Sequence, residues 1–252
     1  MKRVIFNQKG GVGKSSIAVN LAAIRAAQGR RVLVVDLDPQ ANASHYLLGD
    51  LQADHHLGEF FEQFLGFNLL PWPAKRFVVS THFPHLNLMA SHPVLADQHH
   101  RLEVKHKIYK LRDALKELDE YEDVFIDTPP AFNFFTLSAL IAADTCLVPF
   151  DCDRFSRQAL YNLIQAIQEI NADHNPKLRL EGVAVNQYRA RANLPKQMIR
   201  ELKEEGVPIF KTCLSSSVVM QESHERCQPL IHCAPNHKLT SLFQQLADEL
   251  SD

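Results

Sequence analysis

Paired cysteines and long apolar runs are both missing from this sequence. Its 252 residues include five cysteines, an odd number, and none of them forms a CxxC pair. This pattern argues against a disulfide framework and a cysteine-based zinc site, and it suits a reducing compartment. No run of about 18 apolar residues exists that could span a bilayer, and the strand-like start at Arg3 is unlike a secretory signal. We therefore expect a cytoplasmic protein.

An excess of charge of one sign is also absent. Lys and Arg number 27 and Asp and Glu number 29, which gives a formal net charge of −2. Because the chain as a whole attracts no polyanion, contact with nucleic acid would need a local basic patch. A chain of this length can bury one large core, and no linker, repeat or low-complexity tract interrupts it. We expect a single domain over residues 1–252.

Histidines are frequent, and most of the thirteen lie between His45 and His106. A metal cluster would need ligands at a regular spacing on one element, and only the segment HFPH (82–85) comes close to this. We therefore interpret these histidines as surface residues.

Apolar segments rich in β-branched residues alternate with amphipathic ones along the chain. Continuous apolar runs are typical of strands covered on both faces, as in a parallel sheet. The predicted strands are 3–6, 31–36, 86–90, 123–127, 145–150, 180–187 and 207–210, and the predicted helices are 15–28, 94–118, 155–171, 194–205 and 237–250. This alternation predicts an α/β fold with a doubly wound, mostly parallel sheet and helices on both faces. Residues 50–92 are the least regular part, and we expect a surface excursion there.

The clearest chemical signal is the segment GGVGKSS, residues 10–16, which joins the first predicted strand to a helix-forming run. Glycines let the backbone turn its N–H groups onto phosphate oxygens, and the helix that follows adds its positive N-terminal end. In such a loop Lys14 neutralises the β- and γ-phosphates, and the Ser15 hydroxyl ligates Mg²⁺. The segment therefore predicts a nucleotide site at the carboxyl end of the first strand.

This loop is a variant of the usual phosphate-loop pattern. The pattern G-x-x-x-x-G-K-S/T is not met, because Gln8 stands where its first glycine would be. The pattern K-G-G-x-G-K-S is present instead, and it adds a second lysine, Lys9, that needs a separate explanation. We expect nucleotide contacts from Gly10, Gly11, Val12, Gly13, Lys14, Ser15 and Ser16.

Three aspartates end predicted strands. Asp36 and Asp38 lie on the same side of the segment RVLVVDLD, and Asp127 ends DVFID. Beside a phosphate loop, carboxylates at the carboxyl ends of strands favour metal binding and the positioning of water. For Asp36 and Asp38 an alternative stays open, since an aspartate at a strand end often only caps the next turn.

The segment KGGVGKS resembles the deviant Walker A box of the ParA/MinD family of ATPases. The resemblance continues in VLVVDLDPQANAS (32–44), YEDVFIDTPPAF (121–132), ALIAADTCLVPFDCD (139–153) and GVAVNQY (182–188), so it covers nearly the whole chain in the family's order. It implies a P-loop NTPase fold of the deviant Walker A type, with ATP or ADP and Mg²⁺ as cofactors. The implied activity is hydrolysis of ATP to ADP and phosphate.

The resemblance also implies roles for the matching residues. In the family the lysine at the position of Lys9 crosses a dimer interface and contacts the partner's ATP, which explains the second lysine. Asp38 would orient the attacking water, and Thr128–Pro130 resemble the switch segment that senses the γ-phosphate. The implied catalytic residues are Lys9, Lys14 and Asp38. The implied Mg²⁺ residues are Ser15, Asp36 and Asp127.

An amide side chain marks the expected adenine pocket. Asn186 ends the apolar run LEGVAVN, and its amide offers both a donor and an acceptor to the edge of a base. The family often has an amide or hydroxyl side chain at this point, and CLSSS (213–217) stands where relatives close the base pocket. We expect Asn186, Leu214 and Ser215 to contact adenine.

The chain departs from the family pattern in the segment linked to DNA binding. Relatives carry an arginine soon after the position of Leu214, whereas LSSSVVMQESHE (214–225) contains none. The stretch YRARANLPKQMIR (188–200) has several basic residues and no acidic one, so it is the candidate replacement. The expected DNA contacts are Arg189, Arg191, Lys196, Arg200 and Lys203. The alternative is that these side chains only solvate helix faces.

The resemblance implies a short-form ParA-like partition ATPase that positions a plasmid, a chromosome or another cargo. Its ATP-bound homodimer would bind double-stranded DNA without sequence preference and associate with the nucleoid. A ParB-like or cargo adaptor protein would stimulate slow hydrolysis, and no membrane partner is expected.

Two other functions use this fold. A MinD-like membrane switch needs a C-terminal helix with an apolar face and basic flanks, but the end KLTSLFQQLADELSD carries acidic residues that an anionic bilayer would repel. A metabolic enzyme would be an ATP-dependent carboxylate ligase with a substrate pocket, or an iron–sulfur reductase with cysteines at a dimer axis. Cys146 lies inside an apolar run, where a buried thiol is inert.

Overall fold

The computed structural model describes residues 1–153, 156–189 and 191–250. In this part of the chain seven strands form one sheet in the order β3-β4-β2-β5-β1-β6-β7. They are β1 (Lys2–Ile5), β2 (Val32–Asp36), β3 (Val79–Ser80), β4 (Leu86–Met89), β5 (Asp123–Asp127), β6 (Thr145–Asp151) and β7 (Arg179–Asn186). Neighbouring strands run parallel except β3, which pairs antiparallel with β4. The predicted α/β fold with a mostly parallel sheet is confirmed.

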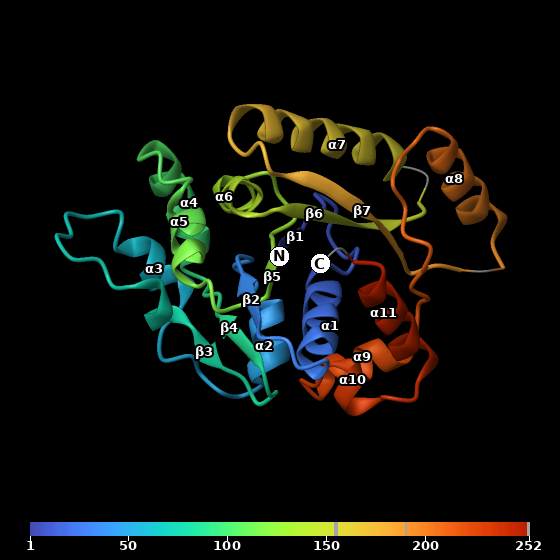
Figure 1. The fold of residues 1–252 in the computed structure, drawn as a ribbon, viewed down its shortest axis with the longest axis horizontal. Helices are drawn as coiled ribbons and strands as arrows, with labels where there is room; N and C mark the ends of the chain where they lie inside the picture. The colour runs from blue at the N-terminus through green and yellow to red at the C-terminus, as the bar shows by residue number, and fades with distance from the viewer. Residues whose placement is uncertain (154–155, 190, 251–252) are drawn as a thin grey trace.

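Helices cover both faces of the sheet (Figure 1). One face packs against α1 (Lys14–Ala27), α2 (Asn42–Leu48), α10 (Leu230–Cys233) and α11 (Lys238–Asp248). The other packs against α3 (Leu57–Glu62), α4 (Leu95–Val104), α5 (Lys110–Glu117), α6 (Phe134–Ala142), α7 (Ser156–Asp173) and α8 (Asn193–Glu204). Every residue of β2 and β5 is buried between these layers, which explains why both strands read as continuous apolar runs.

Two predicted elements differ from the structure, and the start of a third lies outside the described residues. The predicted helix 94–118 is two helices, α4 and α5, separated by a turn in which His106 has a φ of 53°. The predicted strand 207–210 forms only a single parallel bridge, between Ile209 and Val183 of β7. The predicted helix 155–171 starts at a residue outside the described ranges, and α7 begins at Ser156.

The sequence did not predict the short elements. They are β3, α2, α3, α9 (Val218–Glu225), α10 and the 3₁₀ helix η1 (Ala74–Phe77). Most have fewer than two turns, so they carry too few residues for a clear apolar period. No helix in the described ranges has the length and apolar character needed to cross a bilayer.

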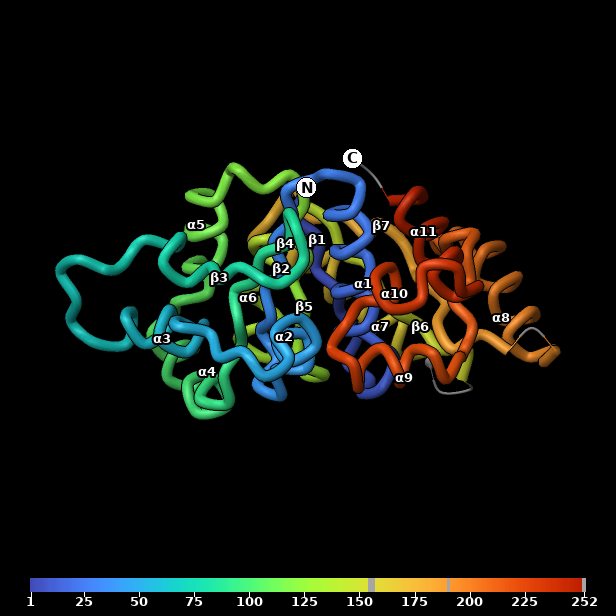
Figure 2. The backbone as a smooth tube through the Cα atoms, turned by 90° about the horizontal axis from the view of Figure 1, so that it is seen from below, coloured from blue at the N-terminus to red at the C-terminus, as the bar shows by residue number. Residues whose placement is uncertain are grey.

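The excursion predicted at 50–92 contains α3, η1 and an exposed apolar loop. Phe60, Phe61 and Phe77 anchor it in the core. Between α3 and η1 the loop extends away from the body at one end of the molecule (Figures 1 and 2). Its tip is unusually apolar, since Phe67 is 93%, Leu69 79% and Leu70 84% exposed.

Candidate functional site

The glycine-rich loop lies between β1 and α1 and leaves the N-terminus of α1 open. Gly11 and Gly13 have φ values of 75° and 90°, which favour glycine. Gly13 is the N-cap of α1, and no side chain caps the helix. Backbone N–H groups of the first turn therefore remain available to an anion, and the helix dipole attracts negative charge to the same place.

Two side chains at the end of β7 hold this loop in shape. Asn186 donates from Nδ2 to the Val12 carbonyl over 2.9 Å, and Gln187 donates from Nε2 to the Gly11 carbonyl over 2.8 Å. The φ of Gly13 strains any other residue, and a Cβ atom there would meet Asn186 Nδ2 at 2.3 Å, so a side chain at position 13 would also displace the Asn186 amide. Asn186 lines the cavity as well as supporting the loop, and its contact with adenine stays a prediction.

Lys14 faces the same site from the first turn of α1. Its side chain is largely buried, and Nζ donates to the Lys9 carbonyl over 3.3 Å. Burial lowers the pKa of Lys14, while the charges of Asp127 and Asp38 act against this. An anion bound here would stabilise the charged lysine.

Asp36 is built into the turn that leads to α2. Its Oδ1 accepts from the Asp38 backbone N–H over 3.1 Å, and its Oδ2 accepts from both the backbone and the hydroxyl of Ser44 over 2.7 Å. Complete burial raises the pKa of Asp36 to about 6 despite these bonds. The carboxylate thus fixes the turn that carries Asp38, and its part in an Mg²⁺ site stays a prediction.

Asp38 and Asp127 lie in different environments. Asp38 lines the cavity, and its Oδ1 accepts from the Gln40 backbone N–H over 3.0 Å. Asp127 is fully buried at the end of β5, and its Oδ2 has no hydrogen-bond partner among the described residues. Burial raises the pKa of Asp127, the Asp36 charge raises it further, and the Ser15 hydroxyl lowers it by hydrogen bonding. An unpartnered buried carboxylate oxygen is costly unless a cation or water meets it.

Ser15 and Asp127 fit an Mg²⁺ site in which a bound polyphosphate supplies the other ligands. The described residues contain no group of three or more His, Cys, Asp or Glu that could hold a metal alone. Mg²⁺ commonly uses one or two protein ligands together with phosphate oxygens and water. The Ser15 hydroxyl and the unpartnered oxygen of Asp127 supply such a partial ligand set.

Lys9 points away from its own loop toward the end of β6. Its Nζ lies 2.6 Å from Asp151 Oδ2 and 3.0 Å from Asp153 Oδ2. Hydrogen bonding to Asp151 is the main reason why the pKa of Lys9 is raised. The side chain is 38% exposed, so it can leave these carboxylates for another anion.

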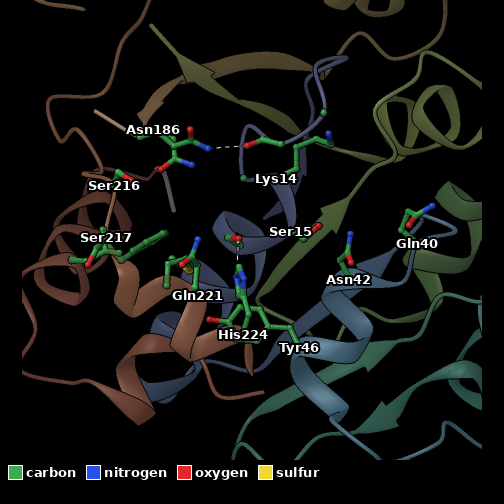
Figure 3. A pocket seen from close by; sticks show the side chains of 18 of the residues that line it. Lys14, Ser15, Gln40, Asn42, Tyr46, Asn186, Ser216, Ser217, Gln221 and His224 are labelled. Carbon is green, nitrogen blue, oxygen red and sulfur yellow. Dashed lines mark hydrogen bonds between the residues drawn. The ribbon is translucent and has the colours of Figure 1, made fainter. Parts of the chain in front are cut away.

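A cavity of about 720 Å³ opens in front of the loop, within the size range of small-molecule sites. Figure 3 shows Lys14 and Asn186 on one side of it, with Tyr46, Gln221 and His224 facing them from α2 and α9. Ser215, Ser216 and Ser217 also line the cavity, whereas the predicted contact Leu214 is buried in the core. The residues of α2 and α9 are distant in sequence from the loop, and no motif signalled them.

The five basic residues predicted to contact DNA are all exposed. Arg189 and Arg191 lie between β7 and α8, and Lys196, Arg200 and Lys203 lie on α8. Residue 190 of this stretch is outside the described ranges. Two nearby acidic residues are paired, because Arg157 of α7 bonds Glu201 over 2.8 Å and also bonds Glu205.

Comparisons with known proteins identify the family. A family model described as an AAA domain matches residues 2–180. The chain is 33% identical over 230 residues to the chromosome partitioning protein ParA of Myxococcus xanthus, a match that covers 90% of this chain and 79% of that protein. It is 31% identical over 253 residues to the sporulation initiation inhibitor protein Soj of Bacillus subtilis, covering 98% and 96%.

Solved structures show the same fold. Apo McdA from Cyanothece matches with a TM-score of 0.85 at 21% identity, over 99% of each chain. The cell division ATPase MinD of Pyrococcus furiosus matches with a TM-score of 0.79 at 21% identity, over 98% of this chain and 97% of that one. With the variant phosphate loop, its two lysines and relatives of this identity over nearly its whole length, the chain belongs to the ParA/MinD family of deviant Walker A ATPases.

Proposed function

We propose that this protein is a partition or positioning ATPase that binds ATP in the cavity and uses it as a switch for dimerisation. The observation that carries the proposal is the open N-terminus of α1, with buried Lys14 beside it and Asp38 and Asp127 opposite. Relatives named as ParA and Soj support the role in partition. The cargo is a plasmid, a chromosome or another cellular body.

Each part of the site has a task in the proposed hydrolysis of ATP to ADP and phosphate. The α1 N-terminus and Lys14 hold the phosphate chain and offset its charge. Mg²⁺, held by Ser15 and Asp127, supplies further neutralisation of the phosphates when it is bound. Asp38 accepts a hydrogen bond from the attacking water and orients it in line with the γ-phosphate. The base lies between Asn186 and Ser215.

Lys9 gives dimerisation its dependence on ATP. Two polyphosphates brought face to face repel each other, and a lysine from each partner reduces this repulsion. In the single chain the Lys9 ammonium forms ion pairs with Asp151 and Asp153. A partner's ATP therefore competes with these carboxylates for the same cation.

The proposed matrix for the dimer is double-stranded DNA. Exposed Arg189, Arg191, Lys196, Arg200 and Lys203 supply positive charge on a chain that is otherwise slightly acidic. Dimerisation doubles the number of phosphates contacted, so only the ATP state binds strongly. The protein then works in the cytoplasm on the nucleoid, and a ParB-like or cargo adaptor stimulates its slow hydrolysis.

Nucleotide binding and turnover test this function. The protein with Mg²⁺ and ATP should release phosphate slowly, and Lys14→Ala should abolish ATP binding in calorimetry because it removes the buried cation that faces the phosphates. Lys9→Ala is the matched control from the same loop: it should keep nucleotide binding and lose ATP-dependent dimerisation. An affinity of Lys14→Ala for ATP within about twofold of wild type would contradict the phosphate-loop assignment.

A further inference from the structure

His224 of α9 reaches across the cavity to the first turn of α1. Its Nε2 lies 3.0 Å from the hydroxyl oxygen of Ser16. Figure 3 shows the imidazole pointing from α9 toward the phosphate-loop helix. The ring lines the cavity and remains accessible from it. A ligand group bound at Ser16 therefore lies within reach of His224.

Buried contacts hold the imidazole in this place. Tyr46 of α2 packs edge-on against the ring, with the centroids 4.7 Å apart and an interplanar angle of 85°. The Tyr46 hydroxyl bonds Ser223, the neighbour of His224, and accepts from Asn20 Nδ2 over 3.2 Å. Asn20 also accepts from the Leu230 backbone N–H over 2.8 Å. Together with the Ser16–His224 contact, these bonds connect α9 to both α1 and α2.

We propose that His224 binds the phosphate chain of the nucleotide next to Ser16, with a protonated imidazole donating a hydrogen bond to a phosphate oxygen. This inference rests on the proposed function, because it needs the phosphates to lie at the α1 N-terminus. It adds a cationic contact from α9 to the contacts of the glycine-rich loop. It also makes nucleotide affinity depend on pH.

The charged groups around the His224 ring determine how its protonation depends on bound nucleotide. Partial burial lowers the pKa of His224, and the charge of Glu225, its neighbour on α9, acts against this. Across the cavity the titratable groups are Lys14 of α1, His45 and Tyr46 of α2, and Asp38. A polyphosphate brings several negative charges to the open side of the ring, so the nucleotide raises its pKa. Affinity then rises as pH falls through the range of histidine titration.

Calorimetry with ADP and Mg²⁺ tests the proposal without hydrolysis. ADP affinity is measured at about pH 8 and pH 6 for wild type and for His224→Gln, which keeps a hydrogen-bond donor that does not titrate. The ADP phosphates titrate alike in both experiments, so the ratio of the two pH effects isolates His224. We expect the gain in affinity on acidification to be about threefold or more larger for wild type.

A matched control and a second measurement complete the test. His232→Gln changes a histidine whose pKa burial also lowers, but which stacks on Phe83 outside the cavity lining; it should keep the wild-type pH effect. In the wild-type protein, NMR titration of the imidazole should show the pKa of His224 rising when ADP binds, with its signals assigned by their absence in His224→Gln.

The outcomes separate the inference from the function on which it rests. ADP binding by both proteins with equal pH effects, or an unchanged His224 pKa, would overturn the role of His224 and leave the proposed function standing. An equal loss of adenosine and ADP affinity in His224→Gln would also overturn it, because adenosine has no phosphate. Failure of wild type to bind ADP at all would refute the proposed function and this inference together.

Discussion

At the scale of single residues, the two lysines of the phosphate loop have different surroundings. Lys14 is 7% exposed, faces Asp38 and Asp127 and lines the cavity of its own chain. The Lys9 ammonium lies 2.6 Å from Asp151 and 3.0 Å from Asp153, at the end of a different strand. Under the proposed function, a partner's nucleotide would have to draw Lys9 away from these two carboxylates.

Weakening the ion pair between Lys9 and Asp151 should favour the dimer. Asp151→Asn removes the charge of the nearer carboxylate, so Lys9 becomes easier to transfer to a partner's phosphates and more dimer should form at a given ATP concentration. Analytical ultracentrifugation with a non-hydrolysed ATP analogue measures this. Asp153→Asn is the control. It should increase the amount of dimer less than Asp151→Asn does, because the Asp153 carboxylate is more exposed and more distant from Lys9. An unchanged or smaller dimer population in Asp151→Asn would show that Lys9 is not held back by this contact.

Where a local motif carries the chemistry, sequence reasoning identified residues that the structure brings to one cavity, and their roles stay predictions. The loop from Gly10 to Ser16 and the strand-end aspartates were predicted, since their roles depend on neighbours along the chain. His224 could not be predicted, because its partner Ser16 lies 208 residues away and only the folded chain brings them together. Leu214 was expected at the base, yet its side chain points into the core and the serines after it face the cavity.

At the scale of elements, burial on both faces made the central strands predictable. β2 and β5 are apolar throughout because helices cover both of their sides. The helix predicted at 94–118 was wrong in its continuity, since the apolar period runs through the turn at His106 and does not reveal a left-handed residue there. α2 and α3, with seven and six residues, are too short to show a period.

The exposed loop between α3 and η1 should contribute little to stability. Replacing Phe67, Leu69 and Leu70 together by serine removes side chains that are already in water, so the free energy of unfolding should stay close to wild type. Phe61→Ala in the adjacent helix α3 is the contrasting variant, because Phe61 is fully buried and its truncation should cost about 3–5 kcal/mol. Urea unfolding measures both. A loop variant as unstable as Phe61→Ala would mean that the loop packs against the body in solution.

At the scale of the whole molecule, the basic helix α8 and the apolar loop lie at opposite ends of the long axis (Figures 1 and 2). The nucleotide site lies between them, at the carboxyl ends of the parallel strands where the fold predicts a ligand. The alternation of strands and helices along the sequence predicted a ligand site at the carboxyl ends of the strands, whereas the proposed DNA surface rests on charge density alone.

Salt dependence distinguishes a DNA surface from a solvated helix face. Arg189→Ala with Arg191→Ala should weaken binding of long duplex DNA by the ATP-bound protein. A plot of the logarithm of the DNA-binding constant against the logarithm of salt concentration should also become less steep, by about 0.9 in slope for each DNA phosphate that the variant no longer neutralises. ATP affinity should stay unchanged. Lys75→Ala with Lys116→Ala is the matched control, because it removes two exposed lysines of η1 and α5. If the arginine and lysine variants showed equal salt slopes, Arg189 and Arg191 would not be part of the DNA-binding surface.

The most direct test of the central claim is the mass of Asp38→Ala in solution with different nucleotides. On the proposal that Asp38 orients the attacking water, this substitution should slow turnover roughly 10²-fold or more, so the ATP state persists long enough to measure. Light scattering with Mg²⁺ should then find a dimer with ATP and a monomer with ADP. The same mass with both nucleotides would contradict an ATP-dependent dimerisation switch.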